Sequence, residues 1–285
     1  MGYLGTYLAQ RNIPYEMVYI SRGESVPPDL QDVSGLIFLG STHSVNAGHA
    51  WIDAELALIR RAAEADVPVL GLCFGGQLIS RALGGAISQA PSMQIGWYRI
   101  EVTPEVAALI GAMLPSSFEA FEWHEETFII PPGGIPLFNG SCEKNQGFVH
   151  GRCLALQFHL EITQDKIQDC LAHDTDSLND SSACVQNADK MLEGLAERIN
   201  QLQKVAGTLF DWWLGGEGKK PSLDNAVDKP VVVERPDNIN PRNRLHPFFG
   251  ITLADNIGAS GTRLSENEPA LFENSPITSA RNHSN

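Results

Sequence analysis

The sequence is short of cysteine, of positive charge and of long apolar runs. Its five cysteines are an odd number without a CxxC pair, which excludes a zinc ribbon and a complete disulfide framework. Lys and Arg total 20 against 34 Asp and Glu, a net charge of −14 that repels phosphate backbones and anionic lipid. The least charged stretch, 67–80, contains proline and glycines and is too short to span a bilayer. We therefore expect reduced cysteines, a cytoplasmic location, and neither nucleic acid nor a membrane as partner.

The start of the chain has no basic leader followed by an apolar run, so the sequence does not predict export. Residues 2–11 resemble a helix and residues 15–20 a strand. An alternating α/β domain usually begins with a strand, and none precedes this helix. We therefore expect the first strand to be missing, with the chain beginning one element late.

The first half of the chain alternates apolar runs of strand length with helical patterns. Residues 35–40 and 67–72 read as buried strands, residues 51–65 as an amphipathic helix, and residues 76–83 as a second helix. This order predicts an α/β fold of the doubly wound, flavodoxin-like type, with a mostly parallel sheet and helices on both faces.

The second half changes to shorter, alternating strands, which predict an antiparallel extension of the sheet. The expected strands are 98–103, 136–141, 147–150 and 153–158, with a turn at Gly151–Arg152 between the last two. A long closing helix is expected over 189–213. Beyond it prolines and asparagines accumulate without apolar periodicity, so we expect one folded domain over 1–216 and a disordered tail over 217–285.

The segment Gly71–Gln77 (GLCFGGQ) places one cysteine between a buried strand and a helix. The flanking glycines permit a sharp turn, and the residue between them protrudes at the carboxyl edge of the sheet. A helix N-terminus favours a thiolate over a thiol. Cys73 is therefore a candidate nucleophile, and a buried structural cysteine is the alternative.

A cysteine nucleophile needs an oriented base, and the segment Gln157–Glu161 (QFHLE) offers one. At a strand end, residues two apart face the same side, so His159 and Glu161 are expected to point together. Alone, a surface His and Glu would be the better interpretation. The preceding cysteine turn favours a catalytic pair.

The two segments GLCFGGQ and QFHLE resemble the signatures G-x-C-x-G-x-Q and F-H-P-E of the class I, triad-type glutamine amidotransferases. The resemblance extends over residues 3–213. It implies that Cys73 is the nucleophile, His159 the general base and acid, and Glu161 the orienting carboxylate.

The resemblance also implies further site residues. The family loop G-G-P-x-S-V corresponds to residues 40–45, so backbone N–H groups at Gly40 and Ser41, with that of Phe74, would hold the oxyanion, although Ser and Thr replace Gly and Pro here. The family pattern also assigns Gln77 and His124 to the substrate region, with 123–128 as an aromatic loop that only packs as the alternative for His124. Relatives commonly carry Glu at the position of Gln94.

The resemblance implies hydrolysis of the L-glutamine side-chain amide through a cysteine thioester, with no cofactor and no metal. The pattern is that of stand-alone proteins similar to the amidotransferase part of GMP synthase. Since the chain has no segment for a synthetase, ammonia would pass to an acceptor on a separate protein. Two alternatives stay open: a cysteine hydrolase of γ-glutamyl amides or peptides, and a non-catalytic regulatory module with the same fold.

Overall fold

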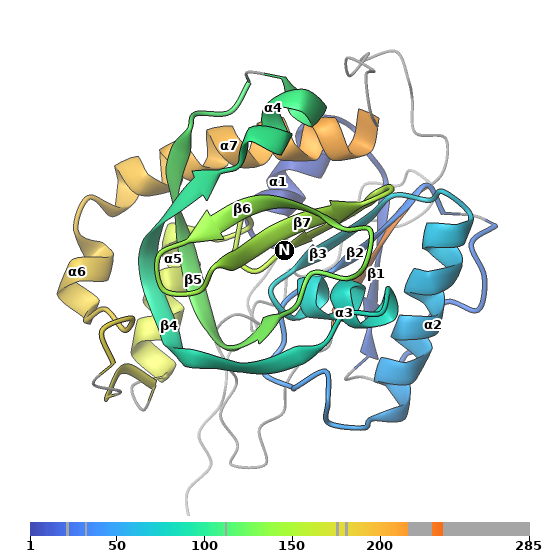
Figure 1. Ribbon diagram of the computed structural model, residues 1–285, viewed down its shortest axis with the longest axis horizontal. Helices are drawn as coiled ribbons and strands as arrows, with labels where there is room; N and C mark the ends of the chain where they lie inside the picture. The colour runs from blue at the N-terminus through green and yellow to red at the C-terminus, as the bar shows by residue number, and fades with distance from the viewer. Residues whose placement is uncertain are drawn as a thin grey trace, which may run out of the picture. The chain divides into compact units, whose positions relative to one another are not determined.

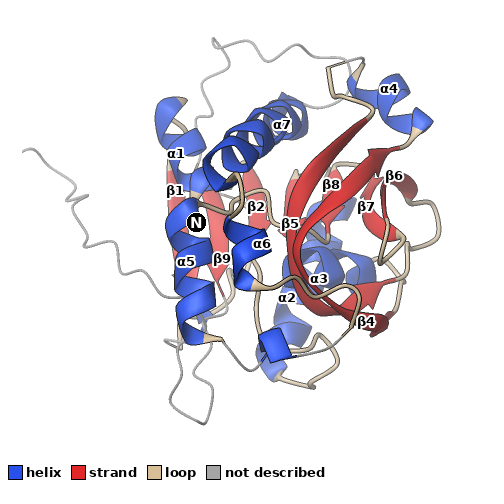
Figure 2. Ribbon diagram, turned by 90° about the vertical axis from the view of Figure 1, so that its left-hand side faces the viewer, coloured by secondary structure: helices blue, strands red, loops and turns tan. Residues whose placement is uncertain are grey.

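A mixed sheet organises the protein, and helices cover both of its faces (Figures 1 and 2). The computed structural model describes residues 1–20, 23–31, 33–111, 113–174, 177–179, 182–215 and 230–235. Within these ranges the sheet has nine strands in the order β1-β9-β2-β3-β8-β7-β6-β4-β5. The strands are β1 Tyr15–Tyr19, β2 Gly35–Phe38, β3 Val69–Leu72, β4 Ile87–Val102, β5 Ser117–Phe128, β6 Ile135–Gly140, β7 Asn145–His150, β8 Cys153–Leu156 and β9 Val231–Arg235.

The helices lie in two layers. They are α1 Tyr3–Gln10, α2 Ala50–Glu64, α3 Phe74–Ala82, α4 Pro104–Ile110, α5 Gln164–His173, α6 Ala188–Leu192 and α7 Leu195–Gly215, with a 3₁₀ turn at Ser177–Asn179. Alternation along the strands divides the core: Ile37 packs with the cluster under α1, α5 and α7, while Leu36 packs with the cluster under α2 and α3. Both faces of the central strands are therefore buried, as the apolar runs predicted.

The sheet has a parallel half and an antiparallel half. Strands β1, β9, β2, β3 and β8 run parallel, and β8, β7, β6, β4 and β5 pair antiparallel. The predicted hairpin at Gly151–Arg152 is confirmed, because β7 and β8 pair on either side of that turn. The doubly wound architecture with an antiparallel extension is thus confirmed.

Strand β9 corrects the predicted tail. The prediction of disorder over 217–285 is wrong for residues 231–235, which pair in parallel with both β1 and β2. The rest of that prediction, 217–229 and 236–285, lies outside the described residues. In a flavodoxin-like sheet the first strand lies between the second and the third. Strand β9 occupies that position, which explains how the sheet forms although the chain begins with a helix.

Two further elements differ from the predictions. The closing helix is divided, because Gly194 has a φ of 62° and separates α6 from the long helix α7. The alternative of an aromatic loop over 123–128 is wrong, because these residues belong to the twelve-residue strand β5. Residues 122–124 are buried consecutively, so β5 has no alternating pattern there for sequence reasoning to detect.

The expectation that all cysteines are reduced is wrong for two of them. Cys142, in the turn between β6 and β7, forms a disulfide with Cys184, which precedes α6, across a sequence separation of 42. Cys73, Cys153 and Cys170 are free and buried. The disulfide joins the β6–β7 turn to a segment whose Cys184 carbonyl accepts a 2.8 Å hydrogen bond from the Ile95 N–H of β4.

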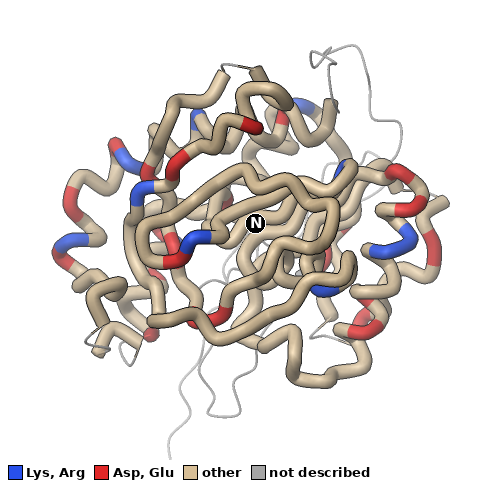
Figure 3. The backbone as a smooth tube through the Cα atoms, viewed as in Figure 1, with Lys and Arg blue, Asp and Glu red and all other residues tan. Residues whose placement is uncertain are grey.

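The central strands β2, β3 and β8 carry no charged residue. Figure 3 shows residues of both signs on α2, whereas the centre of the sheet carries few charges. Of the helices in the described part of the chain, none combines the length and the apolar character that crossing a bilayer requires.

Candidate active site

Cys73 lies in a strained turn between β3 and α3. Its φ of 54° falls in the left-handed region, which costs free energy for a residue with a side chain. Two close approaches require the glycines that flank it: a side chain at Gly71 would collide with the backbone of Gly75, and one at Gly75 with the backbone of Phe38. The N–H of Cys73 donates to the Leu156 carbonyl at 2.8 Å, which fixes the turn to the end of β8.

The Cys73 sulfur is nearly enclosed and has two polar neighbours. The residue is 5% exposed, and Sγ lies 4.0 Å from the Trp123 carbonyl oxygen. The side-chain amide of Gln157 donates to Sγ at 3.9 Å. Strand β5 and the end of β8 therefore both reach the sulfur, while α3 begins at the next residue.

His159 and Glu161 form a buried ion pair just beyond β8. Nδ1 of His159 donates to Glu161 Oε1 at 2.7 Å, and the His159 N–H donates to the Phe121 carbonyl at 2.9 Å. The segment also contacts α1, since the Tyr3 N–H donates to the Glu161 carbonyl at 2.9 Å. The backbone contacts fix the segment, and the Glu161 carboxylate orients the imidazole.

Charge raises the proton affinity of this imidazole. Burial opposes the charged form of His159, but the charges of Glu161 and Cys73, with their hydrogen bonds, raise its pKa well above the ordinary value. Burial likewise opposes ionisation of Glu161, yet His159 lowers the pKa of that carboxyl. A cysteine beside an imidazole held by a carboxylate can perform nucleophilic catalysis.

The predicted oxyanion loop follows β2. Ser41 turns its hydroxyl toward its own loop, where Oγ accepts the His43 N–H at 3.0 Å and lies 3.2 Å from His43 Nδ1. The His43 ring packs against Trp51 at 5.4 Å, and Trp51 packs against Phe74, the first residue of α3, at 5.9 Å. Burial, and then the neighbouring His49, lower the pKa of His43. The structure thus brings this loop against the start of α3.

Gln77 and His124 have polar partners within the protein. The Gln77 side-chain amide donates to the Glu126 carbonyl at 3.0 Å and so ties α3 to β5. His124 Nδ1 donates to the same carbonyl at 3.1 Å. Gln77 thus joins α3, which begins directly after Cys73, to the strand that carries His124.

Sequence reasoning missed Glu122, which forms a second carboxylate–imidazole pair. Its Oε2 lies 3.2 Å from His124 Nε2, and both side chains are essentially buried, at 0% and 2% exposure. Burial raises the pKa of Glu122, and His124 partly offsets this effect. The sequence signal was a charged residue between two aromatic residues of a strand. It indicates a buried carboxylate only once both faces of β5 are known to be covered.

The described residues contain no group of three or more His, Cys, Asp or Glu side chains arranged to hold a metal ion. The acidic and imidazole groups around Cys73 occur instead as pairs.

The fold and the sequence both have known relatives. The crystal structure of a glutamine amido transferase from Methylobacillus flagellatus superposes with a TM-score of 0.72 at 31% identity, covering 76% of this chain and 90% of that one. The glutamine-hydrolyzing GMP synthase subunit of Sulfurisphaera tokodaii is 29% identical over 136 residues, 47% of this chain and 70% of the relative. Gamma-glutamyl peptidase 4 of Arabidopsis thaliana is 27% identical over 151 residues, 50% of this chain and 59% of the relative.

The family model for glutamine amidotransferase class-I matches residues 3–174, more than half of the chain. The matched region begins at α1, includes the turn at Cys73 and continues through α5, so it contains His159 and Glu161. The protein belongs to the class I glutamine amidotransferase family.

Proposed function

We propose that the protein hydrolyses the side-chain amide of L-glutamine through a thioester on Cys73. The observation that carries this proposal is the 2.7 Å hydrogen bond between His159 and Glu161, next to a cysteine at a helix N-terminus. The charge of Cys73 contributes to the raised pKa of His159, so the sulfur and the imidazole interact.

The reaction has two steps. The Cys73 thiolate attacks the amide carbon, the carbon–nitrogen bond breaks, and His159 gives a proton to the departing ammonia. The γ-glutamyl group then remains as a thioester. Water, deprotonated by His159, attacks that carbonyl, and glutamate leaves as the thiol is restored. Glu161 holds the imidazole and stabilises its cationic form throughout.

Backbone N–H groups would stabilise the oxyanion that forms in both steps. We assign this role to the loop at Gly40–Ser41 and to Phe74, because the loop packs through Trp51 against the start of α3. A helix N-terminus offers unpaired N–H groups for this purpose. Losing one such donor lowers the rate by about 100-fold or more.

The ammonia acceptor would be a separate synthetase, as the relation to a GMP synthase subunit suggests. A cytoplasmic location is a proposal from the sequence alone. The Cys142–Cys184 disulfide counts against a strongly reducing compartment, where such bonds are rare.

A γ-glutamyl peptidase activity is the second candidate, because gamma-glutamyl peptidase 4 is among the relatives. Its chemistry would use the same thioester with an amino acid or amine as the leaving group. The two functions therefore differ in what the site accepts beyond the scissile bond and not in the residues that break it.

The test is release of glutamate from L-glutamine by the purified full chain, with γ-glutamyl dipeptides as alternative substrates. The Cys73→Ala variant should lose activity. Cys153→Ala is a matched control, because Cys153 is also buried and free, and burial raises the pKa of its thiol to about 12, so it stays protonated.

Three outcomes are informative. Faster turnover of glutamine than of dipeptides, lost only in Cys73→Ala, supports the proposal. Turnover of dipeptides alone supports the peptidase. Activity that survives Cys73→Ala contradicts the thioester on Cys73, and no activity on any substrate contradicts both candidates and favours a non-catalytic module.

A further inference from the structure

The loop between β2 and α2, residues 39–49, contains a histidine that the proposed steps do not use. His43 lies in the middle of this loop and contacts Ser41, one of the proposed oxyanion donors, in two ways. The Ser41 hydroxyl oxygen accepts the His43 N–H at 3.0 Å and lies 3.2 Å from His43 Nδ1. The backbone and the ring of His43 therefore both contact the same hydroxyl group.

Hydrogen bonds anchor the two ends of this loop to the sheet. At its start, the Leu39 N–H donates to the Glu234 carbonyl of β9 at 3.3 Å. In its second half, Ser44 Oγ donates to Glu126 Oε1 of β5 at 2.8 Å. The Asn46 side-chain amide donates to the backbone of β4 at 3.1 Å. The beginning and the second half of the loop are thus fixed independently of His43.

The middle of the loop is held by packed rings. Among the residues that the structure describes, no backbone hydrogen bond joins 40–43 to another element. The His43 ring instead packs edge-on against Trp51 of α2, with ring centroids 5.4 Å apart, and against His49 at 5.1 Å. Trp51 in turn contacts Phe74, the first residue of α3, at 5.9 Å. A line of rings therefore connects the middle of the loop to the start of α3.

Backbone donors lie at both ends of this line. Within the described part of the chain, neither the Ser41 N–H nor the Phe74 N–H donates a hydrogen bond to another residue. The proposed function assigns these two groups to the oxyanion. Donors of this kind act only when each lies about 2.7–3.1 Å from the same oxygen atom. The separation of the two N–H groups is therefore the quantity that the packed rings must maintain.

The His43 ring can accept a hydrogen bond from the Ser41 hydroxyl. Burial, and then the neighbouring His49, lower the pKa of His43, which favours the neutral ring. A neutral imidazole has one nitrogen that accepts a hydrogen bond. With Nδ1 in that role, the hydroxyl donates to the ring while its oxygen accepts the His43 N–H. Both contacts use the Ser41 side chain, so its backbone N–H stays available to a substrate.

Resting on the proposed function, we propose that His43 is a positioning residue for the oxyanion site. Its ring holds Ser41 through the hydroxyl and is itself held by Trp51, so the ring fixes the Ser41 N–H relative to that of Phe74. Thr42 stands where the family loop has proline, whose ring fixes φ. In this chain the contacts of His43 restrain the loop instead.

The test measures kcat and KM for L-glutamine in variants of the full chain. His43→Ala should lower kcat by about 10- to 100-fold, because a displaced donor loses part or all of its effect on the oxyanion. KM should stay unchanged, since the oxyanion forms only after Cys73 attacks. His43→Asn should restore most of kcat, because an amide oxygen as many bonds from Cα as Nδ1 can accept the Ser41 hydroxyl.

A second variant checks that His43 acts through Ser41. Ser41→Ala keeps the backbone N–H and removes only the hydroxyl, so it should lower kcat by about the same factor as His43→Ala. The double variant should lose no more than either single variant, because both substitutions remove one contact. Losses that multiply in the double variant would overturn the inference.

Two controls separate positioning from a general loss of structure. Alkylation of Cys73 by iodoacetamide needs no oxyanion site, so its rate, followed by mass spectrometry, should be the same in His43→Ala and the wild type. His173→Ala removes an exposed histidine of α5 whose Nδ1 faces the Asp169 carbonyl, and it should leave kcat unchanged. Slower alkylation, a raised KM or a failure of His43→Asn to restore kcat would mark His43 as structural and overturn the inference.

Failure of the proposed function would look different. A wild type that turns over neither L-glutamine nor γ-glutamyl dipeptides contradicts that function, and the inference falls with it. If only dipeptides are turned over, the same variants are compared on them, because the oxyanion forms on either substrate. An active wild type together with an unchanged kcat in His43→Ala overturns the inference alone.

Discussion

The parallel and antiparallel halves of the sheet each carry one buried carboxylate–imidazole pair, but the pairs differ in setting. His159–Glu161 follows the end of β8, at the edge where a parallel sheet commonly binds ligands. Glu122–His124 lies within β5, in the long antiparallel hairpin. The first pair faces the nucleophile's sulfur, and the second extends the site away from it. On the proposed function the first pair does the chemistry, while the second lies in the strand whose Trp123 carbonyl is 4.0 Å from the Cys73 sulfur.

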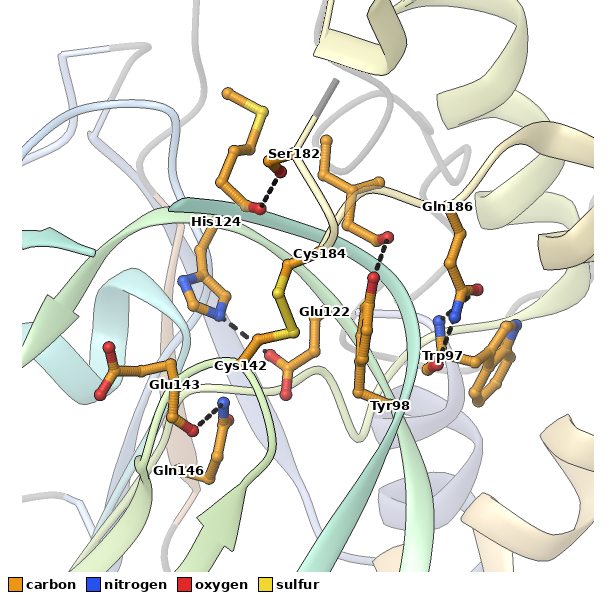
Figure 4. The surroundings of a disulfide bond; sticks show 12 residues. Trp97, Tyr98, Glu122, His124, Cys142, Glu143, Gln146, Ser182, Cys184 and Gln186 are labelled. Carbon is orange, nitrogen blue, oxygen red and sulfur yellow. Dashed lines mark hydrogen bonds and ion pairs between the residues drawn. A yellow bond between two sulfur atoms is a disulfide. The ribbon is translucent and has the colours of Figure 1, made fainter. Parts of the chain in front are cut away.

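The two halves are also completed differently. The parallel half includes β9, which inserts three buried valines, 231–233, between β1 and β2. The antiparallel half is held by the Cys142–Cys184 disulfide (Figure 4). This bond joins the β6–β7 turn to the segment before α6, whose Cys184 carbonyl is hydrogen-bonded to β4. One half therefore depends on a strand distant in sequence, and the other on a covalent bond.

The largest expected effect is on stability, from removing β9. A chain ending at Gly215 should lose about 5 kcal/mol or more of unfolding free energy, because each buried valine contributes about 1.5–3 kcal/mol. Urea denaturation measures it. A chain ending at Pro236 keeps β9 and is the matched control. Equal stability of the two truncated chains would mean that β9 does not complete the parallel half.

The next effect separates the two imidazoles. His159→Gln should lower kcat for glutamine by about 10²–10⁴-fold, the range of general acid–base catalysis, because no group then protonates the leaving ammonia. His124→Gln should act mainly on KM and by a smaller factor. Steady-state kinetics with L-glutamine separates the two. Equal losses of kcat in both variants would contradict the assignment of general acid–base catalysis to His159 alone.

The halves also differed in how far the sequence could predict them. Cys73, His159 and Glu161 lie in short segments at strand ends, where glycine spacing and a two-residue repeat are local signals. Glu122 lies in a strand buried on both faces, where periodicity disappears. Strand β9 is a short valine run among prolines, and its partners lie about two hundred residues away, so only tertiary pairing identifies it. The disulfide likewise depends on the approach of two segments that no spacing rule connects.

A smaller effect on stability is expected in the antiparallel half. Replacing Cys142 and Cys184 by serine should lower the unfolding free energy by about 2–4 kcal/mol, because the loop between them gains freedom in the unfolded chain. Urea denaturation measures it. A thiol reductant should destabilise the wild type and leave the double variant unchanged; identical responses would show that the bond does not hold this half.

The smallest expected effect is the pH dependence of stability caused by Glu234, a buried carboxyl of the parallel half. Burial raises the pKa of Glu234 in β9 from 4.5 to about 7, and burial together with Glu234 raises the pKa of Glu55 in α2. The folded state then binds protons more tightly than the unfolded state. This stabilisation is complete below about pH 4.5 and is lost as pH rises through 7.

The unfolding free energy should therefore fall between pH 5 and pH 8, on the order of 1–3 kcal/mol. Glu234→Gln should flatten that dependence, since a neutral amide replaces the carboxyl that titrates. Denaturation midpoints at several pH values measure it, with Glu64→Gln on the exposed side of α2 as the control. A dependence that persists in Glu234→Gln would place the titration elsewhere. Glu122, by contrast, has His124 beside it. Glu122→Gln should therefore change the pH dependence of the unfolding free energy less than Glu234→Gln does.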